Sequence, residues 1–208
     1  GVQTCALPIS VFLVDADTKG ISIGKEEDKM GIRASATAEI IFEDCFVPDS
    51  ARVGKEGRGF MIAMQTLQMS RPVVAAISVG IAQAAIEAAV AYSHHRKQFG
   101  VKIATFEMVQ QMIADMVMKT EAARILTYKA CVAQMNKDKK AGLYSAMSKC
   151  FASDTAMEVT TTAVQVMGGN GYSRENPVEK YMRDAKIMQI YEGTNQVQRL
   201  VIANETTF

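Results

Sequence analysis

The chain has 208 residues, of which 49% are hydrophobic and 22% are charged, and it contains only four prolines. This composition is typical of a globular protein with a sizeable core and excludes disordered, collagen-like and low-complexity chains. Its 23 Lys and Arg residues against 22 Asp and Glu give a formal net charge of +1. Nucleic-acid binding normally needs a basic excess, so we expect no nucleic-acid partner.

The apolar centre of the chain, the cysteines and the histidines exclude further classes. The uncharged stretch from Pro72 to Ile86 is shorter than the roughly 20 residues that span a bilayer, so no membrane span is expected. No metal site is expected either, because His94 and His95 lack the Glu-x-x-His pattern of di-iron bundles and are better placed at an exposed helix end. The cysteines form no Cys-x-x-Cys pair and are predicted to be reduced thiols: Cys5, Cys45, Cys131 and Cys150.

Residues 10–54 are predicted to be the C-terminal part of a β domain. Apolar and β-branched residues alternate between turn-forming clusters in three segments: Ser10–Asp15, Ile21–Gly24 and Thr37–Val47. The residues before this part, Gly1 to Ile9, read as a lead that does not belong to the native protein.

Residues 55–208 are predicted to form an antiparallel domain of the four-helix-bundle type, so the fold class is mainly α. Runs rich in Ala, Met, Gln, Lys and Glu indicate four to six helices. Breaks are expected at Phe99–Gly100, at Lys137–Gly142 and at Gly168–Gly171. One helix shows a clear apolar stripe at Val109, Met112, Ile113, Met116, Ala123, Leu126 and Ala130.

Two local patterns point to a functional site. The segment from Gln165 to Tyr172 places three glycines after an apolar helix, which permits positive φ and close approach of a backbone or ligand, although a simple helix stop explains it as well. The segment from Ile190 to Gln196 places a carboxylate, Glu192, between an aromatic residue and a glycine. A solvated loop glutamate is the plain interpretation, but the apolar residues before it favour partial burial, which suits a general base.

Several segments of the chain resemble one family in order and spacing. They are Ile41–Pro48, Ser70–Pro72, Arg96–Gly100, Gln165–Tyr172, Tyr181–Lys186 and Tyr191–Thr194. The chain resembles the C-terminal part of the acyl-CoA dehydrogenases, in particular the short- and medium-chain branch of the butyryl-CoA dehydrogenase type. The resemblance runs from about Ser10 to Ala203. It implies that the family's N-terminal helical domain and its flavin-gripping strands should precede Ser10, so the chain is expected to be a fragment.

The resemblance implies an activity and a set of partners. Such an enzyme uses FAD to oxidise a saturated acyl-CoA to the trans-2-enoyl-CoA in fatty-acid β-oxidation and passes the electrons to an electron-transferring flavoprotein. Glu192 matches the catalytic base. Another branch carries its base on the first bundle helix, where this chain has no carboxylate between Gln65 and Ser70, so the straight-chain branch is favoured.

Further roles follow from the resemblance. The implied FAD contacts divide between a neighbouring subunit's cofactor, at Arg96, Phe99, Gln165 and Gly169, and the subunit's own cofactor, at Thr194 and Gln196. The implied substrate contacts are Tyr191, Gly193 and Arg71, although Arg71 could instead cap a helix. Arg183 with Asp184 is predicted to be an internal ion pair.

The family further implies a homo-oligomer, a dimer of dimers. The location would be cytoplasmic in a bacterium and the mitochondrial matrix in a eukaryote. Two alternatives remain: an inactive fragment that serves only as a helical oligomerisation module, and an acyl-CoA oxidase.

Overall fold

The computed structural model describes residues 10–207, which divide into two compact units. The described part of the first unit comprises residues 10–29 and 33–67, and that of the second comprises residues 30–32 and 68–207. The expected non-native lead, residues 1–9, lies outside the described residues.

The first unit contains two antiparallel strand pairs. Strand β1 (Val11–Phe12) pairs with β4 (Arg52–Val53), and β2 (Ile21–Glu26) pairs with β3 (Ala38–Phe42). A short 3₁₀ turn, η1 (Asp49–Ala51), precedes β4. Strands therefore occur in all three predicted segments, although β1 and β3 are shorter than the apolar patterns that predicted them.

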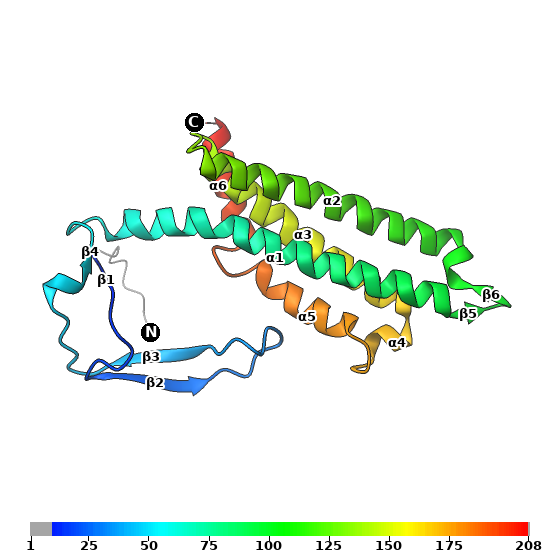
Figure 1. Cartoon of the computed structure of the whole chain (residues 1–208), viewed down its shortest axis with the longest axis horizontal. Helices are drawn as coiled ribbons and strands as arrows, with labels where there is room; N and C mark the ends of the chain where they lie inside the picture. The colour runs from blue at the N-terminus through cyan, green and yellow to red at the C-terminus, as the bar shows by residue number, and fades with distance from the viewer. Residues whose placement is uncertain (1–9, 208) are drawn as a thin grey trace. The chain divides into compact units, whose positions relative to one another are not determined.

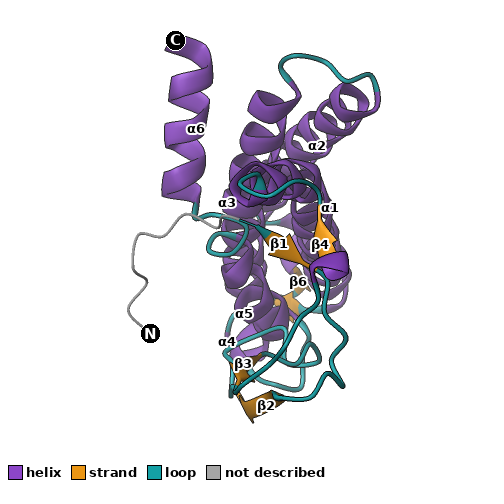
Figure 2. Cartoon of the chain, turned by 90° about the vertical axis from the view of Figure 1, so that its left-hand side faces the viewer, coloured by secondary structure: helices purple, strands orange, loops and turns teal. Residues whose placement is uncertain are grey.

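The second unit is helical, and it contains most of the first helix, which begins in the first unit (Figures 1 and 2). Its elements in chain order are α1 (Gly59–His95), β5 (Lys97–Gln98), β6 (Val101–Lys102), η2 (Ile103–Thr105), α2 (Glu107–Met135), α3 (Ala141–Met167), α4 (Gly169–Tyr172), α5 (Val178–Met188) and α6 (Asn195–Thr207). These six helices among the described residues confirm the mainly α class.

Small buried residues bring the helices together. Helix α3 packs against α2, α4, α5 and α6. Helix α1 buries apolar residues spaced alternately by four and three positions, a pattern that keeps one face turned to its neighbours: Ala75, Val79, Ala82, Ile86 and Ala89. On α2 the predicted stripe is confirmed, since Met116, Ala123 and Ala130 are buried and its other members are half-buried.

Helix α1 is also long and apolar enough to cross a membrane. Its best 18-residue window has a mean hydropathy of 1.9, and 44% of that window is buried inside the structure. The uncharged stretch from Pro72 to Ile86 has 15 residues and therefore did not predict a span. The 18-residue window is longer because it admits up to two charged residues. The core helices of soluble proteins pass the same test, so the finding is weak evidence for a span.

The predicted breaks coincide with changes of chain direction. Phe99 and Gly100 have φ of 52° and 82° and form the turn between β5 and β6. Gly168, with φ of 59°, ends α3. A Cβ atom on Gly171 would lie 2.6 Å from the Val164 carbonyl oxygen, so the glycine cluster permits the close backbone approach that the sequence suggested.

The predicted ion pair between Arg183 and Asp184 is wrong. Arg183 instead binds Glu179 at 2.8 Å, and Asp184 pairs with Lys180. Successive side chains on a helix point in different directions, whereas residues four apart face each other, which explains both pairings. Asp184 also accepts a hydrogen bond from the Ile32 backbone N–H at 2.6 Å.

Candidate active site

The site is built around the loop that joins α5 to α6. The backbone N–H groups of Ile190 and Tyr191 donate to the Ile187 carbonyl as α5 ends, at 2.9 and 3.1 Å. The Asn195 N–H then donates to the Gln189 carbonyl at 3.0 Å and closes the loop. The predicted base therefore lies on a short, hydrogen-bonded loop between two helices.

Glu192 and Gly193 both adopt left-handed backbone conformations. Their φ angles are 58° and 87°, and such a conformation is unfavourable for a glutamate. A Cβ atom on Gly193 would lie 2.7 Å from the Gln198 Nε2 atom, so a larger residue there would displace that amide group. The side chain of Glu192 is half-buried, and one carboxylate oxygen accepts a hydrogen bond from the Ser70 hydroxyl at 2.5 Å.

Buried side chains from three helices hold the carbonyl groups of this left-handed pair. Gln198 Nε2, from α6, donates to the carbonyls of Glu192 and Gly193 at 3.1 and 3.0 Å. Lys149 Nζ, from α3, donates to the Gly193 carbonyl at 2.8 Å. Arg71 Nε, from α1, lies 3.5 Å from the Glu192 carbonyl. Gln198 and Lys149 are 0% exposed and Arg71 is 2% exposed.

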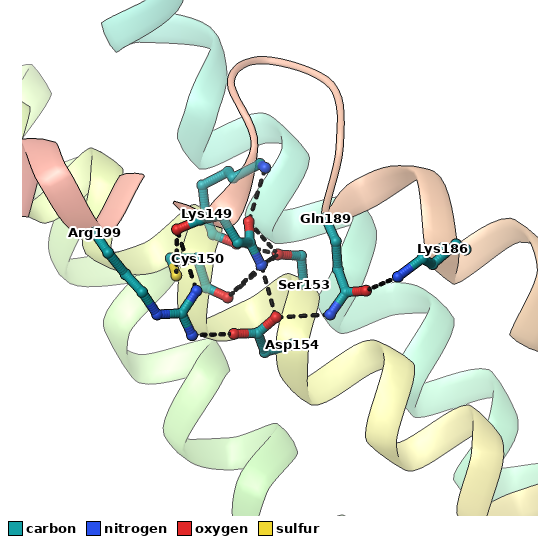
Figure 3. A network of polar contacts seen from close by, with 8 residues as sticks. Lys149, Cys150, Ser153, Asp154, Lys186, Gln189 and Arg199 are labelled. Atoms are coloured by element: carbon teal, nitrogen blue, oxygen red, sulfur yellow. Dashed lines mark hydrogen bonds and ion pairs between the residues drawn. The ribbon is translucent and has the colours of Figure 1, made fainter. Parts of the chain in front are cut away.

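A polar network supports the loop from the α3 side (Figure 3). Its centre is Asn195, which is 3% exposed and accepts from Lys149 Nζ at 2.9 Å while donating to Asp154 at 2.7 Å. Arg199 binds the other oxygen of Asp154 at 2.6 Å. Burial opposes ionisation of Asp154, but hydrogen bonds from Arg199, Asn195 and Gln189 outweigh it and lower the pKa of this carboxyl.

The electrostatics of the loop are set by buried cations. Burial lowers the pKa of Lys149 to about 8. It also lowers the pKa of Arg71, an effect that the charge of Glu192 partly offsets. Burial, followed by the Glu192 charge, raises the pKa of the Tyr191 phenol, whose hydroxyl contacts Met188 Sδ at 2.9 Å. A half-buried carboxylate that such a loop holds in place can accept a proton from a bound molecule.

The structure separates the predicted FAD residues into two groups. Thr194 and Gln196 line a cavity of about 470 Å³ together with Asp154, Lys186 and Arg199. Arg96 and Gly169 line another cavity, of about 370 Å³. The 11 residues of α5 lie between Gly169 and Glu192 in the chain, and a helix of that length spans about 16 Å.

The Arg96 group surrounds the β5–β6 turn and the start of α4. The exposed Phe99 contacts Phe106 edge to face, with ring centroids 6.3 Å apart, and the Gln165 side chain is exposed. Among residues 10–207 the Arg96 guanidinium makes no ion pair or hydrogen bond, and nothing lies within 4 Å of a Cβ placed on Gly169. A free guanidinium beside an open glycine backbone suits a phosphate-bearing cofactor such as FAD.

Local sequence patterns did not identify Lys149 or Gln198 as site residues. Ser70 entered only as part of a family motif and as a position that carries no carboxylate. A spacing signal for Lys149 was present, because it occupies the buried register of α3, which continues through Ala152, Ala156 and Val159. A lysine in such a register must find buried acceptors. Its acceptors belong to a loop more than 40 residues later, so spacing could not identify them.

No group of three or more His, Cys, Asp or Glu residues that could hold a metal ion occurs within the described part of the chain. His94 and His95 are exposed and end α1. Cys45, Cys131 and Cys150 are free thiols.

Comparison with known proteins agrees with this architecture. The family model described as "Acyl-CoA dehydrogenase, C-terminal domain" matches residues 57–207. The mitochondrial short-chain specific acyl-CoA dehydrogenase of Mus musculus is 48% identical over 195 residues, which cover 94% of this chain and 47% of the mouse protein.

Two solved structures show the same fold. Butyryl-CoA dehydrogenase from Megasphaera elsdenii superimposes with a TM-score of 0.94 at 48% identity, covering 96% of this chain and 52% of its own. A chain in a structure of the electron-transferring flavoprotein of Acidaminococcus fermentans superimposes with a TM-score of 0.93 at 54% identity, covering 95% and 52%.

The helical fold and the match over residues 57–207 define this part of the chain as a C-terminal domain of the acyl-CoA dehydrogenase type. The chain belongs to the acyl-CoA dehydrogenase family. It spans about half the length of the relatives it matches.

Proposed function

We propose that this chain supplies the catalytic base and part of the cofactor site of an FAD-dependent acyl-CoA dehydrogenase. The substrate would be a straight-chain short or medium acyl-CoA and the product the trans-2-enoyl-CoA. The observation that carries the proposal is the position of Glu192, half-buried on a hydrogen-bonded loop and surrounded by the buried Arg71, Lys149 and Gln198.

Glu192 would remove the proton from the carbon next to the thioester. That C–H bond is weakly acidic, so the base must be held against it and shielded from water. The Ser70 hydroxyl contacts one carboxylate oxygen and leaves the other to receive the proton. As the α proton moves to Glu192, the β hydrogen leaves as hydride, and the two electrons of the α C–H bond form the new double bond.

The backbone of the same residue would stabilise the developing negative charge. Within residues 10–207 the Glu192 N–H donates no hydrogen bond to a protein acceptor, so it is available for the thioester oxygen. A preorganised donor at the oxygen that gains charge lowers the barrier to proton loss. The left-handed conformation at Glu192 sets the direction of both this N–H and the carboxylate.

FAD, when bound, would supply the acceptor for the β hydride. Arg96, Phe99, Gln165 and Gly169 would hold one FAD molecule, and Thr194 and Gln196 another. The free guanidinium of Arg96 supports the first assignment. Tyr191 would lie at the thioester end of the substrate site. Gly193 and Arg71 would be further substrate contacts, with Arg71 near the CoA.

The partners and location follow from the same proposal. The electrons would pass to an electron-transferring flavoprotein, which the relation to a chain in the Acidaminococcus fermentans structure supports. The preference for straight-chain substrates is supported by Ser70 on α1. This residue contacts Glu192 and carries no carboxylate, so α1 offers no alternative base at this position. The location would be the cytoplasm of a bacterium or the mitochondrial matrix of a eukaryote.

The test is Glu192→Gln in a full-length fusion, in which this chain replaces the matching half of the Megasphaera elsdenii enzyme. The amide keeps the shape of the side chain but cannot accept a proton. We expect FAD and acyl-CoA binding to persist while anaerobic flavin reduction by butyryl- or octanoyl-CoA slows by about 10²- to 10⁴-fold.

The matched control is Glu205→Gln, which changes an exposed glutamate on α6 and should reduce flavin at the parental rate. If Glu192→Gln bleached the flavin as fast as this control, Glu192 would not be the base.

A further inference from the structure

The buried ammonium group of Lys149 is a charged donor to the Glu192 loop. It extends from the middle of α3, is 0% exposed, and contacts the Gly193 carbonyl at 2.8 Å and Asn195 Oδ1 at 2.9 Å. Burying a charged lysine is costly unless it is well paired. The core of α3 therefore accommodates a cation whose acceptors include the backbone next to the proposed base.

The loop needs such a donor because its backbone is strained. A glutamate with φ of 58° lies in an unfavourable backbone region, which persists only when the surrounding contacts hold it in place. Lys149 and Gln198 both donate to the Gly193 carbonyl. Without them, the peptide between Glu192 and Asn195 would be free to relax, and the carboxylate would turn with it.

We propose that Lys149 is a positioning residue, which holds the Gly193 carbonyl and thereby keeps Glu192 in the left-handed conformation that aims its carboxylate and its N–H at the substrate. This role rests on the proposed function of Glu192 as the base. Gln198 is the second arm of the same clamp, because its amide bridges the carbonyls of Glu192 and Gly193.

The first measurement needs no catalysis. In the 208-residue chain, Lys149→Met keeps the length of the side chain and removes the donor. We expect amide hydrogen exchange of residues 191–195 to rise by about tenfold or more, while exchange in the middle of α2 changes less. Gln198→Met should release the same residues, so the proposal remains testable if one variant does not fold.

The second measurement uses the full-length fusion. Both variants should retain FAD and a near-parental KM, while kcat for flavin reduction falls by about ten- to a hundredfold, since small misplacements of a reacting group have effects of this size. The double variant should lose less than the product of the single losses, because both donors act on one carbonyl. Lys149→Arg, which keeps the charge and the donors, should recover part of the rate.

The matched control is Thr160→Val. Thr160 is buried on the same helix, and its hydroxyl donates to the Ala156 carbonyl of that helix at 2.8 Å, so it belongs neither to the loop nor to the network around Asn195. The substitution should lower stability without slowing flavin reduction.

Unchanged loop exchange in folded Lys149→Met and Gln198→Met, or an equal rate loss in Thr160→Val, would overturn the positioning role. Loop release by both variants in a fusion whose parent never reduces its flavin would instead refute the function proposed for Glu192.

Discussion

Lys149 shows how a single residue can couple stability to pH. Its ordinary pKa of 10.5 is lowered to about 8 by burial in the folded chain. Between these two values the unfolded chain retains a proton that the folded chain has released. The free energy of unfolding therefore rises with pH across that window. The destabilisation caused by the buried charge is greatest below about pH 8.

We predict that Lys149→Met removes this pH dependence. Between about pH 8 and 10.5, the free energy of unfolding of the parent should rise relative to that of the variant by up to about 3 kcal/mol. Urea unfolding of both proteins at several pH values measures the difference, in which the other titrating groups cancel. Parallel pH profiles would show that Lys149 keeps its ordinary pKa in the folded state.

At the scale of elements, the residues proposed for two different functions lie on opposite sides of α5 in the chain. The Glu192 loop follows α5, whereas α4 and the β5–β6 turn carry the residues proposed for a neighbouring subunit's FAD. Arg96 begins this turn, and the Ile103 N–H donates to its carbonyl at 2.9 Å, so its backbone is fixed while its guanidinium remains available. Among the described residues, the Arg96 guanidinium donates to none of the carbonyl groups that end α1.

We predict that Arg96→Ala weakens FAD retention in the full-length fusion but leaves flavin reduction at saturating FAD nearly unchanged. A charge-assisted hydrogen bond contributes roughly 1.5–3 kcal/mol, so FAD should bind about ten- to a hundredfold more weakly. Melting temperatures with and without excess FAD are the measurement, because ligand binding stabilises the folded state by mass action.

The control is Lys97→Ala, an exposed cation in the same strand pair. An equal loss of melting temperature by Arg96→Ala with and without FAD would assign Arg96 to the stability of its own helix end instead.

At the scale of the whole molecule, α2 presents a second apolar stripe in addition to the buried one. Its members are 54% to 81% exposed and repeat at intervals of seven, three and four residues, as in coiled-coil contacts: Met118, Ile125, Tyr128, Val132 and Met135. Exposed apolar surface in such a register is typical of a contact with another helix.

We predict that the 208-residue chain associates with itself through this stripe and binds FAD only weakly, since it spans half the length of its relatives and offers part of the cofactor contacts. Light scattering and a flavin fluorescence titration measure the two properties. Replacing Ile125 and Val132 by Glu should shift the chain toward the monomer, whereas Leu13→Glu, at an exposed site in the first unit, should not. A monomeric, tightly flavinated chain would contradict the prediction.

Most helices, and the loop that carries Glu192, could be predicted from local sequence patterns. The stripe on α2 and the glycines at the ends of helices are local signals, because helix periodicity and positive φ depend on neighbouring residues. The wrong prediction of an ion pair between Arg183 and Asp184 shows that adjacency in the chain does not predict which side chains meet. Helix geometry pairs Arg183 with Glu179 and Asp184 with Lys180 instead.

The sequence by itself determined the family resemblance, the mainly α class and Glu192 as the candidate base, since these depend on residue types at fixed spacing. Only the tertiary structure decided what holds that base in place. Ser70, Lys149 and Gln198 lie on three different helices, and they converge on one strained loop because helix packing brings together side chains that are distant in the chain. No periodicity in the sequence encodes which buried donor meets which carbonyl, so the carbonyl clamp became visible only in three dimensions.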